Sequence, residues 1–253
     1  IHGEADLSEE VIRIKGFDAI PVLPIRTENK INEVILSRTY KNNLRSKRFL
    51  AQRGGNELVT WSFSSSKDSK FYSTNQYLKI KNPISEDLDI LRPSLIPNLL
   101  TAIKKNISRG FDSFSIFEVG SQFTSDTPGD QKNIACGLKS GIKTEKNWNS
   151  QKVDFDSYDV QADILALVNH LMAKNKNIEI KTGAPDWYHP GRSASLTINK
   201  DTVLGYFGEL HPKIIKHHKI KNRVLAFELF IDEVPFSSKK TTNKESYLSL
   251  IHI

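Results

Sequence analysis

The chain has 253 residues, of which 38% are hydrophobic, and it carries a formal net charge of +7 with a single cysteine. This composition provides for one sizeable domain with a core, and it excludes a disulfide framework. No apolar run reaches the length of a membrane span and no signal peptide opens the chain, so we expect a protein of the reducing cytoplasm. The positive charge permits contact with nucleic acid, although a solvated lysine-rich surface explains it equally well.

A short helix is predicted over residues 6–15, where Gly16 ends it. Its apolar face consists of three residues at helical spacing, Leu7, Val11 and Ile14. Its first turn contains three carboxylates, those of Asp6, Glu9 and Glu10. These carboxylates either complement the helix dipole or provide a site for a hard cation such as Mg²⁺.

A long helix is predicted from about Asn32 to Arg53. Its buried face is expected to comprise Leu36, Tyr40, Leu44 and Ala51. The opposite face carries four basic residues, Arg38, Lys41, Arg45 and Arg48. This stripe either contacts RNA phosphates or is simply solvated.

A strand over 57–63, with apolar residues at alternate positions, leads towards the central stretch 80–110. There an extended segment, 88–92, ends at Pro93, and Ser94 is the predicted N-cap of a helix that Gly110 stops. The apolar face of this helix comprises Ile96, Leu99, Leu100, Ile103 and Ile107. Leu95 projects off that face, so we expect it to belong to an exposed patch that contacts a partner.

The rest of the chain alternates strands and one further helix. Strands are predicted over 114–123, 133–138, 178–181 and 224–231, a hairpin over 195–210, and a helix over 159–173. The segment 187–194 is interpreted as a Pro-Gly turn that enters the hairpin rather than as a catalytic site. Glu209 and His211 are expected at a hydrogen-bonded strand end, and His217 and His218 on the surface.

Several segments match one family in chain order. They are Asp6-Leu7-Ser8-Glu9-Glu10-Val11, Asn82-Pro83-Ile84-Ser85, Leu91-Arg92-Pro93-Ser94-Leu95-Ile96-Pro97-Asn98-Leu99-Leu100, Phe117-Glu118-Val119-Gly120, His189-Pro190-Gly191-Arg192-Ser193-Ala194 and Gly205-Tyr206-Phe207-Gly208-Glu209-Leu210-His211-Pro212. Together they resemble the bacterial phenylalanyl-tRNA synthetase beta-subunit family, over nearly the whole chain. Gly55 departs from the aromatic residue that the family carries at that turn.

The resemblance implies an α+β fold, in which an antiparallel sheet flanked by helices forms a class II aminoacyl-tRNA synthetase-like, catalytically silent core. The end of a helical DNA-binding-like module would precede this core. The implied division is a remnant of that module at 1–21, the core at 22–235, and a linker with a non-native tail at 236–253. Because the chain starts at Ile1, we expect it to be an internal fragment of a longer reading frame.

The resemblance also implies a chemistry. Active class II cores hold ATP with two arginine-bearing motifs, Phe-Arg-x-Glu and Gly-x-Gly-x-Gly followed by Arg, and neither occurs in this sequence. The active site is therefore expected on an alpha subunit, in an alpha2beta2 tetramer that attaches phenylalanine to tRNA with ATP and Mg²⁺. Asp6, Glu9 and Glu10 match the family's magnesium ligands, and a further aspartate ligand of the family would lie before Ile1.

Two other classes of protein remain as alternatives. A stand-alone basic nucleic-acid-binding module would show salt-dependent RNA binding without any alpha subunit. A metallohydrolase built on Glu and His residues would contain stoichiometric zinc, although the His-Glu-x-x-His spacing is absent from the sequence.

Overall fold

The computed structural model describes residues 3–23, 35–72, 78–127, 129–172, 177–199 and 202–235. The chain divides into two compact units, Ile1–Leu36 and Ser37–Ile253. The sequence also predicts that residues 25–27 pair as an edge and that Pro128-Gly129 forms a turn. Residues 25–27, Pro128 and the tail 236–253 lie outside the described residues. In the described part, no helix is both long and apolar enough to cross a membrane.

The first unit contains helix α1 (Glu4–Lys15) and a short 3-10 helix, η1 (Phe17–Ala19). This confirms the helix predicted over 6–15. Gly16 ends α1 at a φ of 94°, where a side chain would be strained, and its N–H bonds to the carbonyl of Ile12. The predicted apolar face lies in water within this unit, since Leu7, Val11 and Ile14 are all more than half exposed.

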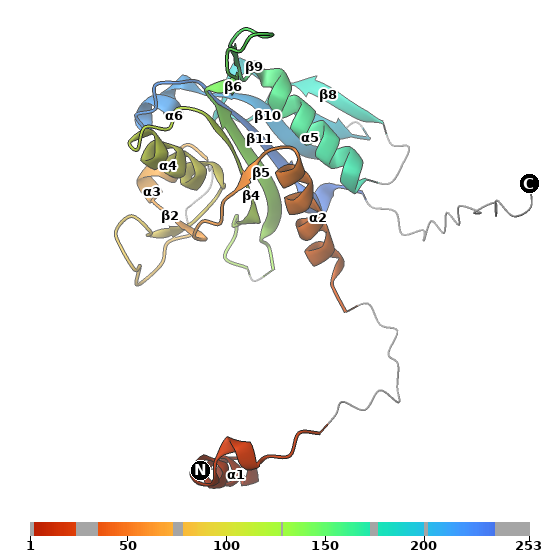
Figure 1. Cartoon of the computed structure of the whole chain (residues 1–253). Helices are drawn as coiled ribbons and strands as arrows, with labels where there is room; N and C mark the ends of the chain where they lie inside the picture. The colour runs from red at the N-terminus through yellow and green to blue at the C-terminus, as the bar shows by residue number, and fades with distance from the viewer. Residues whose placement is uncertain are drawn as a thin grey trace, which may run out of the picture. The chain divides into compact units, whose positions relative to one another are not determined.

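The second unit is built on a seven-stranded sheet with the order β1-β4-β5-β11-β10-β9-β8 (Figure 1). Its strands are β1 (Asn56–Glu57), β4 (Phe114–Gln122), β5 (Lys132–Ser140), β8 (Ile178–Thr182), β9 (Tyr188–Ile198), β10 (Thr202–Leu210) and β11 (Val224–Phe230). Neighbours pair antiparallel except β1 and β4, which are parallel, so the sheet is mixed rather than wholly antiparallel as expected.

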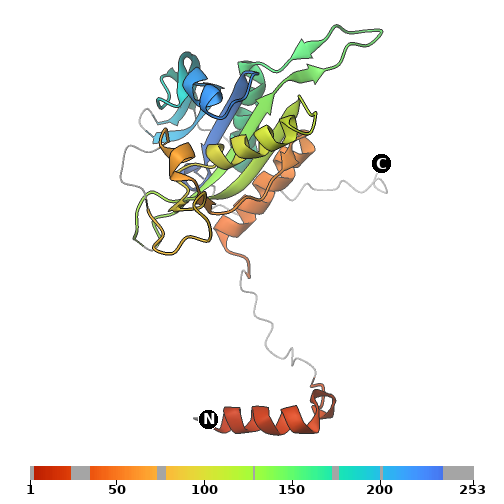
Figure 2. The ribbon, with the colours of Figure 1, turned by 90° about the vertical axis from the view of Figure 1, so that its left-hand side faces the viewer.

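Two small sheets supplement the main one. Strand β2 (Phe63–Ser64) pairs with β3 (Ile90–Leu91), and β6 (Ile142–Thr144) pairs with β7 (Val153–Asp154) in a hairpin that projects beyond the main sheet (Figure 2). The single strand predicted over 57–63 is therefore wrong. The chain leaves the main sheet after β1 and joins a different sheet at β2, because β1 finds its partner in β4 and β2 finds its partner in β3.

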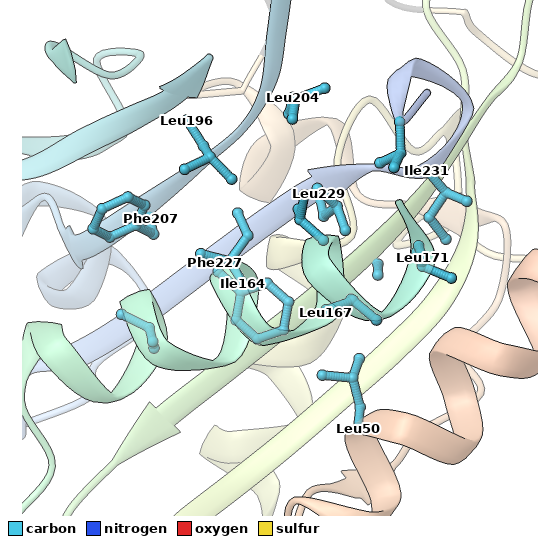
Figure 3. Packing of buried hydrophobic residues seen from close by; sticks show 14 of the residues in the cluster. Leu50, Ile164, Leu167, Leu171, Leu196, Leu204, Phe207, Phe227, Leu229 and Ile231 are labelled. Carbon is cyan, nitrogen blue, oxygen red and sulfur yellow. The ribbon is translucent and has the colours of Figure 1, made fainter. Parts of the chain in front are cut away.

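Helices cover both faces of the main sheet. Helices α2 (Arg38–Gln52) and α5 (Ser157–Leu171) pack on one face, where Leu50, Ile164 and Leu167 meet Phe227 and Leu229 (Figure 3). The opposite face packs against α4 (Ile96–Ile107) and α6 (Pro212–His217), with α3 (Ser66–Ser69) beside them (Figures 1 and 2).

Helix α5 corresponds to the helix predicted over 159–173, but it begins and ends two residues earlier. Asp156 accepts N–H bonds from Tyr158 and Asp159, and the Asp159 carboxylate accepts the Asp156 N–H, which completes a capping box. The apolar residues of α5 at helical spacing predict an inward face, and all four are buried, namely Ile164, Leu167, Val168 and Leu171. A capping box and an apolar stripe together specify both the start and the buried face of this helix.

Helix α2 differs from the sequence prediction in two respects, the residue at which it begins and the face that it buries. It begins at Arg38 rather than near Asn32, because the Ser37 hydroxyl caps it by accepting the N–H of Tyr40. Leu36, Tyr40 and Ala51 are exposed and Leu44 is half-buried, whereas the buried positions are Asn42, Ser46 and Leu50. The Ser46 hydroxyl donates to the Asn42 carbonyl, so this small polar face is satisfied when it packs. The basic residues of the helix are largely exposed, as predicted.

The Pro190-Gly191 segment also differs from its prediction. Instead of a turn before the hairpin, it lies inside β9, where Gly208 pairs with Ser193 but Leu210 pairs with Tyr188. The extra residues of β9 form a bulge opposite Glu209, and the Ser193 hydroxyl donates to the His189 carbonyl within it. The hairpin formed by β9 and β10 is otherwise as predicted.

Candidate functional site

A row of polar side chains crosses the main sheet on the face that α4 covers. In the strand register, Glu118 of β4 stands opposite Cys136 of β5, Cys136 stands opposite Glu228 of β11, and Glu228 stands opposite Tyr206 of β10. Directly opposed residues of antiparallel strands project to the same face, so these four side chains form one line. A polar line through a sheet is where chemistry or a ligand would be expected.

Glu118 is held by an arginine from another element. Arg92 Nη1 lies 2.7 Å from Glu118 Oε1, and the two side chains are only 3% and 4% exposed. Arg92 makes two further hydrogen bonds, since Nη1 donates to Thr60 Oγ1 at 2.9 Å and Nε donates to the Ser121 carbonyl at 2.8 Å. Thr60 in turn donates to Glu118 Oε2 at 2.7 Å. The pair is thus closed by its own hydrogen bonds.

Glu228 is buried, and its hydrogen-bond partners are neutral. It accepts from Ser94 Oγ at 2.8 Å, from Trp187 Nε1 at 3.0 Å and from the Tyr188 hydroxyl at 3.2 Å. None of these three donors carries a positive charge. Burial raises the pKa of Glu228, and the three hydrogen bonds oppose that rise.

Ser94 connects this carboxylate to the start of α4. Its hydroxyl donates to Glu228 and accepts the N–H of Ile96 at 3.1 Å. The prediction of Ser94 as the N-cap is one residue early, because the helix starts at Ile96 and Leu95 takes the N-cap position. The Ser94 side chain nevertheless satisfies one free N–H of the first turn.

Cys136 is enclosed at the centre of the row and has no measurable exposure. Burial raises the pKa of its thiol well above the usual value, and Glu228 and Glu118 raise it further. A thiol in this state remains protonated at neutral pH and is a poor nucleophile. The Tyr188 hydroxyl, whose pKa burial and Glu228 raise, is likewise un-ionised.

The two carboxylates do not face the open surface. Hollows of about 670 Å³ and 410 Å³ flank the row, the first with Thr60 in its wall and the second with Tyr188. Arg92, Glu118 and Glu228 line neither hollow. The polar groups of this row are therefore engaged inside the chain rather than presented to a substrate.

The glycines of the segment 205–208 serve the sheet. A Cβ at Gly205 would lie 2.2 Å from the Glu228 carbonyl oxygen, and one at Gly208, whose φ is 142°, would lie 2.3 Å from the Arg192 carbonyl oxygen. Both positions require glycine because a neighbouring strand passes too close for a side chain. The segment lies within β10, with a register shift against β9 at each end, and it is not a loop that could cradle a phosphate.

The predicted metal ligands lie on α1. Asp6, Glu9 and Glu10 are exposed, and Arg13 Nη2 lies 2.6 Å from Glu10 Oε2. Among the described residues, no three His, Cys, Asp or Glu side chains converge as a metal-binding group. The structure therefore places these carboxylates on one short helix.

Of the two histidines predicted on the surface, His217 is partly exposed, but His218 is buried. His218 is only 3% exposed, and its Nε2 has no hydrogen-bond partner among the described residues. Burial lowers the pKa of His218 to about 4, with His217 and Lys104 acting in the same direction and Asp68 opposing them. His217 Nε2 lies 2.9 Å from Asp68 Oδ1. Tertiary packing around α6 thus decided the burial of His218.

The expected strand end is confirmed. Arg192 Nη1 lies 3.0 Å from Glu209 Oε2, and His211 Nδ1 accepts the Lys213 N–H at 3.1 Å. Both side chains are engaged within the chain, which leaves the metallohydrolase alternative without this ligand pair.

Leu95 overturns the expected exposed patch. Its side chain has no exposure and belongs to the same core cluster as Leu99 and Ile103. Leu95 therefore packs internally, and the expectation of an exposed patch is wrong. The argument for a partner surface at this residue is lost with it.

Sequence reasoning missed Glu228 and quoted Arg92 and Glu118 only as parts of motifs. The available signal was chemical, since an Arg and two Glu residues occur in segments that are otherwise apolar. Charged residues in such segments are seldom buried without partners. Which acid the arginine binds depends on strand pairing, and the sequence does not show that pairing.

A family model described as the phenylalanyl tRNA synthetase beta chain CLM domain matches residues 25–231. The phenylalanine–tRNA ligase beta subunit of Bartonella henselae is 38% identical over 255 residues, which cover 99% of this chain and 32% of that protein. The corresponding subunit of Rhodospirillum rubrum is 37% identical over 251 residues, which cover 99% of this chain and 31% of that protein. The chain thus spans about a third of the length of these relatives.

Among solved structures, a pyrrolysyl-tRNA synthetase from Desulfitobacterium hafniense superposes with a TM-score of 0.58 at 10% identity. The alignment covers 91% of this chain and 71% of that one. At this identity the likeness concerns the fold alone, which is the α+β core of a class II synthetase.

Proposed function

The chain belongs to the phenylalanyl-tRNA synthetase beta-chain family, and from this we propose that it forms a catalytically silent core within a phenylalanine–tRNA ligase. The ligase would attach phenylalanine to its tRNA using ATP, with the active site on an alpha subunit. The hydrogen bonding of the polar row supports the proposal that this core is catalytically silent. Arg92, which pairs with Glu118 of that row, is bound by Glu118, Thr60 and the Ser121 carbonyl rather than directed at a nucleotide.

Physical chemistry explains why such a row would be silent. Adenylate formation requires preorganised positive charge at the ATP phosphates, and removal of such groups costs orders of magnitude in rate. Here Arg92 is paired with Glu118 and both side chains are buried, so this pair presents no positive charge to a polyphosphate. The role left to the chain is to support the assembly and the geometry of the active partner.

The partners follow from family membership. We propose an alpha2beta2 tetramer in the cytoplasm, with tRNA as the macromolecular substrate, and the end of a DNA-binding-like module at the N-terminal unit. The comparisons favour this assignment over a stand-alone basic nucleic-acid-binding module.

Asp6, Glu9 and Glu10 are proposed as part of a magnesium site. Carboxylate oxygens suit Mg²⁺, and Asp6 and Glu10 stand four residues apart, which puts them on one face of α1. Arg13 competes for Glu10, and three carboxylates on one helix cannot complete an octahedral shell. Waters and residues from elsewhere in the assembly would complete it.

The metal proposal has its own test. In the whole beta subunit, replacement of Asp6, Glu9 and Glu10 by alanine should shift the Mg²⁺ concentration needed for assembly with the alpha subunit. Glu4→Ala, which removes an exposed carboxylate from the same helix, is the matched control. An unchanged Mg²⁺ dependence in the triple variant would refute the assignment.

The proposed function itself is tested by co-expression. The beta subunit containing this chain should co-purify with the alpha subunit and yield phenylalanine-dependent charging of tRNA. Failure of the two subunits to associate, or association without charging, would refute the proposal.

A further inference from the structure

The hairpin formed by β6 and β7 is an arm anchored to the rest of the second unit. At its base the Phe155 N–H bonds to the Gly141 carbonyl at 3.0 Å, and Lys143 Nζ lies 2.6 Å from Asp159 Oδ1 at the start of α5. Beyond this base the arm extends away from the main sheet, as the green ribbon in Figure 2 shows. The arm therefore presents its tip at a defined position relative to the core.

The tip is an ordered turn. Asn147 Oδ1 accepts the N–H groups of Asn149 and Ser150 at 2.8 Å and 2.9 Å, and the Asn147 N–H bonds to the Ser150 carbonyl at 3.0 Å. An asparagine whose side chain bonds to backbone groups in this way restricts the turn. The residue enclosed between these hydrogen bonds is Trp148.

Trp148 is 97% exposed, more than any other apolar side chain of comparable size in the described part of the chain. Tryptophan has a large apolar surface, and its exposure gives no benefit to the fold of this chain. Burial against another molecule would recover that hydrophobic stabilisation, and tryptophan is enriched among the residues that dominate binding at protein interfaces. The ordered turn also lowers the entropy lost on binding.

The charge of the arm favours a protein over a nucleic acid as its binding partner. Its ionisable residues are Lys143, Lys146, Lys152, Glu145 and Asp154. Lys143 is paired with Asp159, which lies outside the arm. The charges of the two other lysines equal in number those of the two acids, so the rest of the arm has no net positive charge. Binding to RNA depends on the neutralisation of phosphates by an excess of cations, and that excess is absent from this arm.

We propose that Trp148 is an anchor that inserts into a pocket of the alpha subunit in the assembled ligase. The pocket has apolar walls that enclose the indole ring and an oxygen acceptor for its N–H. This inference rests on the proposed function, which supplies the partner, and adds the residue that would hold it.

The test compares two exposed aromatic residues in the whole beta subunit. Trp148→Ala should raise the dissociation constant for the alpha subunit on the order of thirtyfold, the loss expected of an interface anchor. Tyr158→Ala on α5 removes a side chain that is 76% exposed, and it should change the constant less than about threefold. Trp148→Phe should recover most of the affinity because it keeps an aromatic ring. Circular dichroism of the free variants should match the wild type.

Fluorescence provides a second readout. The difference in emission between wild type and Trp148→Phe isolates this indole, and that emission should move to shorter wavelength when the alpha subunit is added. Equal affinity of Trp148→Ala and wild type would overturn the inference while wild-type assembly upheld the proposed function. A shifted emission in the free beta subunit, or a shift caused by tRNA in the absence of the alpha subunit, would also overturn it.

Discussion

Arg92 and Glu118 form an ion pair of 2.7 Å beneath α4, at a depth where both side chains have lost nearly all contact with water. The pair joins the segment before α4 to strand β4 of the main sheet. Its stabilising effect depends on both partners being present, because a single buried charge left behind carries the full desolvation penalty.

Arg92→Met should therefore lower the free energy of unfolding by about 3–5 kcal/mol, since it leaves the Glu118 carboxylate buried without its cation. Urea denaturation followed by circular dichroism measures the change. The control is Lys132→Met, which breaks an exposed pair of 3.7 Å with Glu233 and should cost less than about 1 kcal/mol. Equal losses for the two variants would show that the buried pair is not structural.

Glu228→Gln should flatten the dependence of stability on pH. Because the folded-state pKa of Glu228 is raised, the native state binds this proton more tightly than the unfolded state does. The wild type should therefore lose stability as pH rises from the ordinary value of 4.5 through the raised pKa. The glutamine amide can accept from Trp187 and donate to Ser94, so the variant should keep these contacts and should not show the loss. Unfolding free energies from pH 4 to 9 provide the comparison, and identical slopes would contradict the assignment.

Gly205→Ala should destabilise the second unit by at least about 2 kcal/mol, because the new methyl group would collide with the Glu228 carbonyl of β11. Gly191→Ala is the matched change, since the nearest atom to its added Cβ is 3.8 Å away. It should alter stability by less than about 1 kcal/mol. Thermal unfolding of the two variants is the measurement, and Gly205→Ala should have the lower midpoint temperature. A tolerant position 205 would mean that the strands can move apart at this point.

His218 should be neutral when the protein is folded at pH 7. Since its pKa is lowered from 6.5 to about 4, the unfolded state binds this proton first, and the wild type should lose stability as pH falls through that interval. The loss approaches about 3 kcal/mol below pH 4. His218→Phe should remove this part of the pH dependence. An NMR titration that finds the His218 pKa near 6.5 would refute the assignment of a buried neutral ring.

The chain by itself should not activate phenylalanine. Because Arg92 is bound by Glu118, no arginine of the polar row is directed at ATP, so phenylalanine-dependent exchange of pyrophosphate into ATP should equal the buffer control. The assay on the purified chain is the measurement. Exchange clearly above that control would show that this core is not silent.

The sequence by itself determined the elements whose local signals agree. The apolar stripe of α5 specifies this helix, although the helix begins two residues before the predicted start. The alternating strands after Ser195 specify a hairpin, and the motifs between residues 6 and 232 specify the family. These features depend on neighbours in the chain, so periodicity and turn chemistry are sufficient to read them.

Tertiary structure alone decided which face of α2 is buried, that Leu95 lies inside, and that His218 is enclosed. It also decided that Arg92 binds Glu118 while Glu228 is satisfied by Ser94, Trp187 and Tyr188. Each of these outcomes depends on residues far apart in the chain that strand order and helix packing bring together. Amphipathic spacing identifies an apolar stripe on a helix, but the surface against which the helix packs determines which stripe is buried. Here α5 and β4 pack against the small polar face of α2.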